Sequence, residues 1–509
     1  MRTMNMADLL TAAAERHPEK VALRYGEADV GARLTFSELD AEVDKVFAGL
    51  AALGVTQGDR VAIAMPNVPR FVAAYLGALR AGAVAVPLNA MLTAIELTRI
   101  LNDCEPLVLL GAGLPGEAAA GAAADVASLR HVIAETNWDE SFGQDASPPK
   151  VSLSDDDLAV LAYTSGTTGQ PKGAMLTHAN LLANLDQQMA IPEEHVRPDD
   201  VLLMVLPLFH IFGLNVPLGL LLKNAATGVL LERFDPVGSL RLIEKEKVTI
   251  VFGAPPMYQA WVSTPGADQY DLSSVRIAVS GAAPLPLAVL QSFHEIFGVE
   301  IDEGYGLTES APTLTSNRMA AKPKPGSVGK PLPGIDMRII NESGDDVELG
   351  DPGEIVVRGP NVFKGYWNQP EQTAAVLRDG WLYTGDVAVK DEEGFIHLVD
   401  RKRDLVIVSG FNVYPAEVEA ALLENPAVQE AAVIGAPHPY RGETLKAFVV
   451  LAPGAAATES ELAEDVHQRI ARFKWPESIQ IVDDLPHLLS GKVLRRALRQ
   501  DVPPESAPV

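Results

Sequence analysis

The stretch RVAIAMPNVPRFVAAYLGALRAGAVAVP, residues 60–87, decides the fold class. Residues 60–65 form a short apolar run, which is typical of a buried strand. A helical pattern follows across residues 71–79, and a second apolar run covers residues 83–87 after Gly82. Two parallel strands need such a crossover helix between them, and the sheet that they form has both faces covered. The stretch therefore predicts a βαβ unit and an α/β fold with parallel layers.

Outward from this unit, further strand-and-turn patterns occur at 248–253, at 276–280 and around residue 301. The acidic stretch 137–157 is rich in Ser and Pro and predicts a surface loop ahead of the next strand. From 325 to 399 the pattern changes to short strands separated by Gly and Pro turns, which is typical of a small β-rich unit.

The pattern changes again after Asp404, where helices and strands predict a compact α+β unit. The helices are expected at 415–423 and 461–473, and the strands at 428–434, 445–451 and 478–482. We therefore predict a large N-terminal domain over 1–402, with its β-rich subunit at about 325–400, and a small mobile C-terminal domain over 403–509.

Composition and charge limit the partners of the chain. The 509 residues carry 67 acidic and 41 Lys and Arg side chains, a formal charge of −26, which argues against nucleic acid as a partner. The single cysteine excludes an intramolecular disulfide and a cysteine-based metal cluster. The first residues lack the pattern of a signal peptide, and no apolar run is long enough for a transmembrane segment. We expect a cytoplasmic protein.

The segment YTSGTTGQPKG, residues 163–173, follows the apolar run 158–162 and is rich in groups that bind anions. Its glycines allow backbone N–H groups to converge on an anion, its four hydroxyls add donors, and Lys172 adds a positive charge. It differs from a Walker loop, because Gly173 replaces the hydroxyl residue after the lysine and Pro171 stands where a helix would begin. The segment predicts a phosphate-binding loop, with a polar surface turn as the alternative.

The longer segment YTSGTTGQPKGAMLTH, residues 163–178, closely resembles the phosphate-loop signature of the acyl-adenylate-forming superfamily. That family contains acyl-CoA synthetases, adenylation domains of peptide synthetases and firefly luciferases, and its other signatures follow in order along the whole chain. The resemblance is greatest to the fatty acyl-CoA synthetase branch. It implies that the loop and Lys172 bind the phosphates of ATP, through Thr164, Ser165, Gly166, Thr167, Thr168 and Gly169. His178 at the end of the segment is expected to be a structural residue.

The segment YGLTE, residues 305–309, resembles the family's adenine and Mg²⁺ motif. The resemblance implies that Tyr305, followed by Gly306, stacks on adenine, that Thr308 contacts the α-phosphate, and that Glu309 binds the metal with Thr164. A second segment, SGAAP at 280–284, resembles the loop whose backbone lies along the adenine. It adds three residues to the expected nucleotide site, Gly281, Ala282 and Ala283.

The remaining signatures lie towards the C-terminus. Asp386, in YTGD, matches the aspartate that binds the ribose hydroxyls. The segment DRKRD, residues 400–404, resembles the junction motif, in which Arg401 would bind the nucleotide and Arg403 would be the hinge; the family more often has Asp or Lys at the hinge. The sequence SGK at 490–492 matches the end of the catalytic-lysine motif and implies that Lys492 is catalytic. Coenzyme A would approach the loop of Ser409, Gly410 and Phe411.

The reaction that this resemblance implies uses ATP, Mg²⁺ and coenzyme A. Its first step brings three negatively charged groups close together. The catalytic set is expected to comprise Lys492, Thr308, Glu309, Lys172 and His210. In the first step a carboxylate attacks the α-phosphorus of ATP, so the site needs cations that strengthen their contacts in the transition state. In the second step the C-terminal domain rotates at the hinge and admits the thiol.

The acid itself is less well defined by the sequence. PLFHIFG, residues 207–213, matches the family segment in which His210 would gate the acid, although a histidine in apolar surroundings is more often a core residue. The neighbouring candidates are mostly apolar, and Gly304, Gly281 and Ala282 are small. These residues favour a medium- or long-chain fatty acid, with an aromatic acid second. The candidate lining residues are Phe209, Phe212, Leu214, Val251, Phe252, Ala254 and Met257.

Three alternatives remain for the whole chain, and the first, a luciferase-type oxidation, has no positive support in the sequence. A peptide-synthetase adenylation domain would normally continue into a carrier domain, whereas here the sequence given ends soon after Lys492. An inactive nucleotide-binding protein is disfavoured because the residues expected to be catalytic are present. Two further possibilities stay open at this point: a homodimer, and a carrier-protein thiol in place of coenzyme A as the acyl acceptor.

Overall fold

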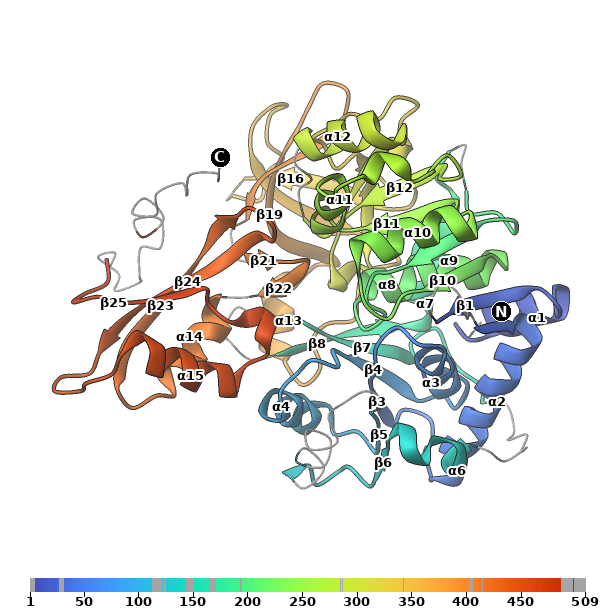
Figure 1. The fold of residues 1–509 in the computed structure, drawn as a ribbon, viewed down its shortest axis with the longest axis horizontal. Helices are drawn as coiled ribbons and strands as arrows, with labels where there is room; N and C mark the ends of the chain where they lie inside the picture. The colour runs from blue at the N-terminus through green and yellow to red at the C-terminus, as the bar shows by residue number, and fades with distance from the viewer. Residues whose placement is uncertain are drawn as a thin grey trace. The chain divides into compact units, whose positions relative to one another are not determined.

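The computed structural model describes most of the chain (Figure 1). The described residues are 5–26, 32–111, 121, 125–142, 151–164, 171–192, 195–283, 285, 287–341, 343–401, 406–413, 415–486 and 498. The chain divides into two compact units. The larger comprises Met1–Ala90, Leu101–Tyr163 and Gly173–Asp400, and the smaller comprises Met91–Ile100, Thr164–Lys172 and Arg401–Val509. The expected domain boundary between 402 and 403 stays a prediction.

The βαβ unit expected from residues 60–87 is confirmed. Strand β3 (Arg60–Ala64), helix α3 (Pro69–Arg80) and strand β4 (Val84–Leu88) follow one another, and the two strands pair in parallel from Arg60 opposite Val84. Every residue of α3 from Phe71 to Leu79 is buried, because the helix packs between the sheet and α2 (Phe36–Ala52). The unit belongs to a six-stranded sheet. Its other strands are β6 (His131–Ile133), β5 (Val108–Leu110), β7 (Leu158–Thr164) and β8 (Lys172–Thr177).

A nine-stranded sheet is the second layer of the larger unit. Its central strands are short and apolar and pair in parallel, as expected for a sheet covered on both faces. The strands at 248–253, 276–280 and 301 are confirmed as β11, β12 and β13. In spatial order the sheet contains β15 (Lys330–Pro331), β14 (Thr313–Ser316), β13 (Ile301–Gly306), β12 (Ile277–Ser280), β11 (Ile250–Gly253), β9 (Val201–Met204), β10 (Thr227–Leu230), β1 (Val21–Tyr25) and β2 (Ala32–Thr35).

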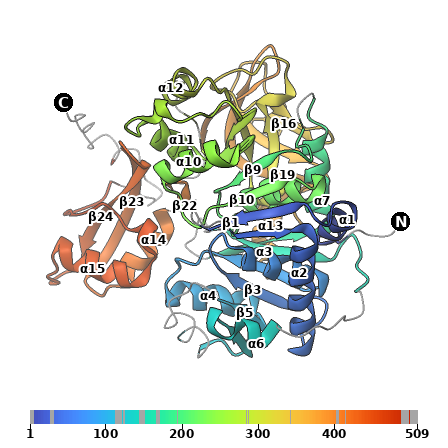
Figure 2. The same ribbon diagram turned by 45° about the vertical axis from the view of Figure 1, so that its right-hand side comes forward.

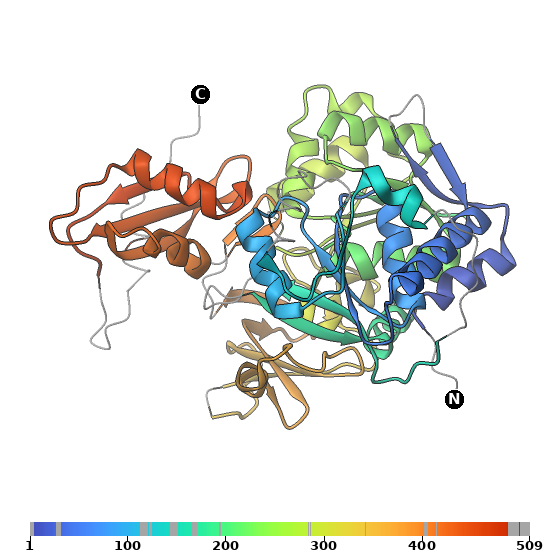
Figure 3. The ribbon, with the colours of Figure 1, turned by 90° about the horizontal axis from the view of Figure 1, so that it is seen from below.

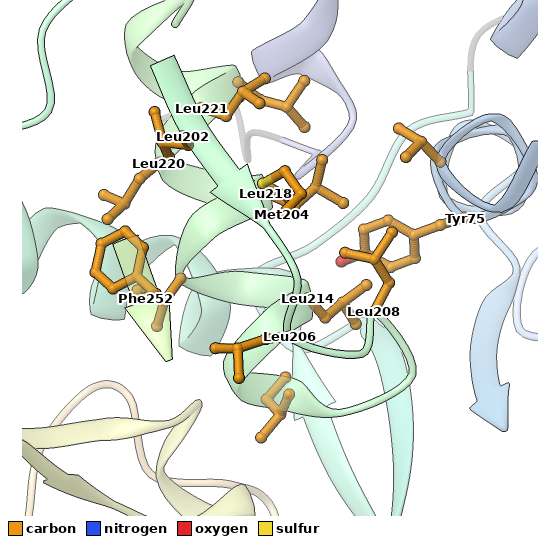
Figure 4. Close-up of a cluster of buried hydrophobic side chains, with 14 of the residues drawn as sticks. Tyr75, Leu202, Met204, Leu206, Leu208, Leu214, Leu218, Leu220, Leu221 and Phe252 are labelled. Carbon is orange, nitrogen blue, oxygen red and sulfur yellow. The ribbon is translucent and has the colours of Figure 1, made fainter. Parts of the chain in front are cut away.

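Helices cover these sheets, and apolar side chains fill the space between the layers. Figure 2 shows α10, α11 and α12 grouped beside the nine-stranded sheet. Figure 4 shows part of the core, in which Leu202 and Met204 of β9 lie near Leu218 and Leu221 of α9. The helices are α1 (Asp8–Arg16), α4 (Ala94–Cys104), α7 (His178–Met189), α8 (Ile211–Asn215), α9 (Pro217–Asn224), α10 (Pro236–Glu246), α11 (Pro255–Val262) and α12 (Leu287–Phe297). Among the described residues, no helix has the length and apolar character needed to cross a bilayer.

The β-rich subunit expected at about 325–400 is present as a five-stranded antiparallel sheet (tan in Figure 3). Its strands are β16 (Asp336–Ile340), β17 (Gly353–Arg358), β18 (Leu377–Arg378), β19 (Trp381–Lys390) and β20 (Ile396–Arg401), with the short helix α13 (Pro370–Val376).

The smaller unit contains the expected α+β arrangement. Figure 1 shows α14 and α15 beside the long β23–β24 hairpin. The helix over 415–423 is confirmed, whereas the second helix ends earlier than expected and continues as a 3₁₀ turn at Arg472–Lys474. The elements are β21 (Val406–Val408), β22 (Phe411–Val413), α14 (Pro415–Leu423), β23 (Val428–His438), β24 (Gly442–Leu451), α15 (Glu459–Arg469) and β25 (Ser478–Ile481).

The prediction of a plain surface loop over 137–157 was wrong at its beginning. Residues Trp138–Phe142 form the helix α6. Both aromatic side chains are buried, their rings lie edge to face with centroids 4.7 Å apart, and a Cβ at Gly49 would lie 2.3 Å from the ring of Phe142. The i, i+4 spacing of the two rings was the signal that composition concealed.

Candidate functional site

The nucleotide motifs of the larger unit lie where parallel strands end. Gly253 at the end of β11 is opposite Ser280 at the end of β12, and Ser280 is opposite Glu303 in β13. The residues that follow these strands therefore share one edge of the sheet. In open α/β sheets this carboxyl edge is where ligands bind.

The turn after β12 carries the expected adenine loop. The N–H of Gly281 donates to the carbonyl of Gly253 at 3.1 Å, and Ala282 has a φ of 70°, in the left-handed region. Ser280 is only 1% exposed, and its hydroxyl has no hydrogen-bond partner among the described residues. A buried hydroxyl without a hydrogen-bond partner lowers the stability of the fold. The turn thus offers a polar group that a bound ligand could satisfy.

Tyr305 and Asp386, expected to hold adenine and ribose, are brought into direct contact. The Tyr305 hydroxyl donates to Oδ2 of Asp386 at 2.6 Å, and both side chains are buried. Asp386 lies on β19, where its N–H donates to the hydroxyl of Thr384, which in turn donates to the carbonyl of Ile355 on β17. Two separate motifs, 81 residues apart, therefore meet on rigid strands.

Glu309, the expected metal ligand, lies in a 3₁₀ turn (Thr308–Ser310) after β13. Its Oε1 accepts a hydrogen bond of 2.6 Å from the hydroxyl of Tyr366, and its carbonyl accepts one of 2.9 Å from the N–H of Phe363. The next carbonyl, of Ser310, accepts one of 2.7 Å from the side chain of Asn361. Thr308 and Glu309 are both half-buried.

The carboxylate of Glu309 fits a Mg²⁺ ion that is held mainly by substrate phosphates and water. The described residues contain no cluster of three or more His, Cys, Asp or Glu side chains that could hold a metal. Mg²⁺ in nucleotide enzymes is usually held by one or two carboxylates, substrate phosphates and water. Since Oε2 of Glu309 has no hydrogen-bond partner among the described residues, one carboxylate oxygen is available for such binding.

His210 precedes α8 and accepts, through Nδ1, a hydrogen bond of 3.2 Å from the N–H of Phe212. Its apolar surroundings lower its pKa to about 4, because desolvation disfavours the charged ring. His210 is therefore neutral near pH 7, and a neutral ring that accepts at Nδ1 carries its proton on Nε2. The helix-capping contact gives it a structural role, and its gating of the acid stays a prediction.

Some candidates for the acid pocket lie beside the expected adenine loop, and others are buried in the hydrophobic core. The ring of Phe212 fills the space beside Gly281, where a Cβ would lie 2.9 Å from Cε1 of that ring. Phe212 in turn lies edge to face with Phe252, with centroids 6.4 Å apart. Leu214 is fully buried in the core cluster with Leu208 (Figure 4), so its role is packing.

The glycines of the YGLTE strand are tightly constrained. A Cβ at Gly306 would lie 2.1 Å from the carbonyl oxygen of Pro312, which no side chain can tolerate. At Gly304 the carbonyl of Thr315 lies 3.0 Å from where a Cβ would stand, so this position also favours glycine. The absence of a side chain at Gly304 therefore has a steric cause.

The described part of the phosphate loop consists of its two ends. Thr164 ends β7, and Lys172 begins β8 with a side chain only 7% exposed. A strand, not a helix, follows the loop, which is how it differs from a Walker loop. His178 begins α7, and its Nδ1 accepts a hydrogen bond of 3.1 Å from the N–H of Met6, so its structural role is confirmed. Ser165, Gly166, Thr167, Thr168 and Gly169 lie outside the described residues.

The smaller unit contains the expected coenzyme A loop. Ser409 and Gly410 have φ values of 51° and 84° and form a tight turn between β21 and β22. Such a turn needs two residues in the left-handed region. The ring of Phe411 lies 4.5 Å from that of Phe473, centroid to centroid. Arg403, Lys492 and the side chain of Arg401 lie outside the described residues.

Sequence reasoning missed Tyr366 and Asn361, which support the Glu309 turn. They lie more than 50 residues from the turn, within a stretch of Gly and Asn that reads only as a loop. The one available signal was the aromatic pair of Tyr366 and Trp367, which follows Gly365 in a segment rich in Gly and Asn.

Comparisons with known proteins identify the family of the chain. Residues 10–367 match the AMP-binding enzyme family, and residues 417–492 match the AMP-binding enzyme C-terminal domain. The chain is 39% identical to a long-chain-fatty-acid–CoA ligase of Bacillus subtilis, over 97% of this chain and 94% of the relative. It is 42% identical to a feruloyl-CoA synthase of an Amycolatopsis species, over 98% and 99%.

A solved structure of a double mutant of o-succinylbenzoate-CoA synthetase from Bacillus subtilis, bound to a product analogue, has the same fold. It superposes with a TM-score of 0.87 at 33% identity, covering 97% of this chain and 98% of the other. The chain belongs to the AMP-binding enzyme family of adenylate-forming enzymes, in its acyl-CoA synthetase branch, and is an acid–thiol ligase.

Proposed function

We propose that this enzyme converts a medium- or long-chain fatty acid to its acyl-adenylate and then to its coenzyme A thioester. The observation that carries the proposal is the hydrogen bond of 2.6 Å between Tyr305 and Asp386, which joins the expected adenine and ribose residues. Glu309 lies four residues beyond Tyr305 on the same strand-and-turn segment, so the expected adenine residue and the expected metal ligand are held by one continuous piece of backbone.

In the first step a carboxylate oxygen of the acid attacks the α-phosphorus of ATP, the bond to the β-phosphate oxygen breaks, and pyrophosphate leaves. Lys172 and Lys492 would neutralise the phosphate charge that builds up in the transition state, and Thr308 would donate to the α-phosphate. Glu309 would hold Mg²⁺, whose charge offsets that of the phosphates. No nucleophilic side chain is required.

In the second step the sulfur of coenzyme A attacks the acyl carbon, its proton is released, and AMP leaves with the bonding electrons. Coenzyme A would approach the Ser409–Gly410 turn, where Gly410 has no side chain and the N–H of Ser409 holds the turn in place by donating to the carbonyl of Arg441 at 3.0 Å. Rotation about the predicted hinge at Arg403 would exchange the Lys492 segment for this turn.

The apolar character of the residues near His210 supports an apolar acid. His210 is neutral near pH 7 because its pKa is lowered to about 4, so it offers no positive charge for a second carboxylate. Gly304 has no side chain, and a side chain there would crowd the carbonyl of Thr315. A dicarboxylic substrate would lack a counter-charge at these positions, whereas an aliphatic chain needs none.

An aromatic acid is the second candidate. The edge-to-face pair of Phe212 and Phe252 is an arrangement that aromatic rings favour, and a ring of a substrate could extend it. The 42% identity to a relative named feruloyl-CoA synthase supports the same candidate.

The test is release of pyrophosphate from ATP and Mg²⁺ with a panel of acids: C6 to C18 fatty acids, hydroxycinnamic and benzoic acids, and malonate. We expect the fatty acids to give the highest kcat/KM and malonate to give none. Thioester should form only when coenzyme A is added. Asp386→Asn serves as the matched control for the nucleotide site. Absence of pyrophosphate release with every acid would refute the activity, and a preference for hydroxycinnamates would favour the second candidate.

A further inference from the structure

Tyr366 makes a contact to the proposed metal-binding carboxylate that none of the nucleotide motifs includes. Its hydroxyl donates to Oε1 of Glu309 at 2.6 Å. The two residues are 57 positions apart, and both belong to the larger unit. The contact uses one oxygen of the carboxylate and leaves Oε2 without a partner among the described residues.

The backbone and ring of Tyr366 are held firmly. The side chain is only 4% exposed, and its ring lies edge to face with that of Phe363, with centroids 5.0 Å apart. Its N–H donates to the hydroxyl of Thr373 at 2.9 Å, and its backbone forms an antiparallel bridge with Ala174 in β8. The hydroxyl is therefore presented from a fixed position.

The backbone of Glu309 is also fixed, but its side chain is not. The N–H of Phe363 and the amide of Asn361 hold the carbonyls of Glu309 and Ser310. These bonds leave the rotatable side-chain bonds of Glu309 free. Among the described residues, the hydroxyl of Tyr366 is the only side-chain group bonded to the carboxylate.

We infer that Tyr366 is a positioning residue, which orients the carboxylate of Glu309 so that its second oxygen can bind the Mg²⁺ of the bound nucleotide. This inference rests on the proposed function. A hydroxyl that donates to one oxygen of a metal-binding carboxylate restricts the rotation of that carboxylate and so reduces the ordering that metal binding requires. The same contact supplies no charge of its own, so it should act only through Glu309.

The test is Tyr366→Phe, which removes the hydroxyl and keeps the ring against Phe363. The measurement is calorimetric titration with ATP at several Mg²⁺ concentrations, without acid. The Mg²⁺ concentration that gives half-saturation should rise about tenfold, because losing a hydrogen-bond partner of a metal ligand typically weakens metal affinity by about 10–100-fold. Binding of ATP in the presence of EDTA should be unchanged. Pyrophosphate release should show the same shift in Mg²⁺ dependence, with kcat restored at high Mg²⁺.

Two further variants test whether the effect passes through Glu309. In the Glu309→Gln background, adding Tyr366→Phe should shift the half-saturating Mg²⁺ concentration less than twofold. The carboxylate that Tyr366 is inferred to orient is already absent there. Glu309→Asp keeps the charge but withdraws it from the hydroxyl, and it should resemble Tyr366→Phe even if that variant fails to fold. Tyr75→Phe is the matched control, since the Tyr75 hydroxyl is buried without a partner among the described residues. It should behave as the unmodified enzyme.

The outcomes separate the inference from the proposed function. Unchanged Mg²⁺ dependence in folded Tyr366→Phe overturns the role of Tyr366, whatever the result with Glu309→Asp. An equal loss of ATP affinity with Mg²⁺ and with EDTA also overturns it, because such a loss would indicate a damaged nucleotide site. Calorimetric shifts as expected, in an enzyme that releases no pyrophosphate with any acid, would uphold the role of Tyr366 and refute the proposed activity. Failure of the unmodified enzyme to bind ATP with Mg²⁺ overturns both.

Discussion

The ring of Phe212 occupies the space that a side chain at position 281 would need, since a Cβ at Gly281 would lie 2.9 Å from its Cε1. The glycine of the expected adenine loop and an aromatic residue of the expected acid site are thus in direct contact. A change in the size of either side chain should therefore shift the position of the other residue.

Gly281→Ala should therefore weaken use of the acid. The added methyl group forces the Phe212 ring to move, and overpacking of this kind costs about 1–3 kcal/mol, so the KM for the acid should rise about tenfold. Steady-state pyrophosphate release at saturating ATP measures it. Adding Phe212→Leu should restore much of the loss. No rescue would indicate that the methyl group disturbs the adenine loop itself.

Tyr305→Phe should weaken ATP binding and also lower the free energy of unfolding, because the buried carboxylate of Asp386 loses a donor. The variant removes the hydrogen bond to Asp386, and hydrogen bonds to charged groups contribute about 1.5–3 kcal/mol. We expect the dissociation constant of ATP, measured by calorimetry, to rise about tenfold or more. Tyr258→Phe is the matched control, because the Tyr258 hydroxyl donates to a backbone carbonyl instead, that of Val279. A larger effect on ATP binding in this control would contradict the assignment.

Lys492→Ala should impair adenylation more than thioester formation. Loss of one group that stabilises the transition-state charge typically lowers kcat about 10²–10³-fold. Pyrophosphate release should fall by this factor, whereas conversion of a synthetic acyl-adenylate to thioester should change less than threefold. Equal loss in both half-reactions would indicate that Lys492 serves the fold or both steps. Lys446→Ala is the control for loss of a lysine in the C-terminal part.

Unfolding should become easier in mild acid because of His178. Burial lowers its pKa to about 4 in the folded state, against about 6.5 when unfolded, so between these values the unfolded state binds more protons. The resulting stability is present above pH 6.5 and is lost as the pH falls towards 4, by about 3 kcal/mol. In His178→Asn this part of the pH dependence should disappear. Urea unfolding at pH 7, 6, 5 and 4 compares the two proteins, and parallel curves would contradict the prediction.

Lys474→Met should destabilise the smaller unit. The ammonium group of Lys474 lies 2.5 Å from Glu417 and 2.8 Å from Glu96, and all three side chains are nearly excluded from solvent. Burial lowers the pKa of Lys474, but the two carboxylates outweigh this effect and raise it overall, so the lysine is charged. Removing it would leave two buried carboxylates, which costs about 3–5 kcal/mol.

Hydrogen exchange of the β23 and β24 amides, in the unit that contains this triad, measures that loss. Faster exchange is expected in Lys474→Met, and the double variant with Glu417→Gln should recover part of the protection, because one uncompensated charge is removed. Protection equal to that of the unmodified protein in the single variant would mean that the triad contributes nothing to stability.

The sequence alone determined the order of the elements and the class of site. Apolar runs separated by a helical pattern specify parallel pairing because only a crossover helix can join such strands, as β3, α3 and β4 do. The expected nucleotide residues could be named because each sits in a short contiguous motif. Trp138 and Phe142 were misread because the acidic composition hid their i, i+4 spacing, which becomes meaningful only through the packing of Phe142 against Gly49.

Only the tertiary structure decided which of these residues meet. The hydroxyl of Tyr305 reaches Asp386, Tyr366 reaches Glu309, and Phe212 fills the space beside Gly281. Each pair is separated by more than 50 residues, and nothing in either segment specifies its partner. The physical reason is that local propensity and periodicity act within a few turns of chain, whereas side-chain contacts depend on how whole layers pack against one another.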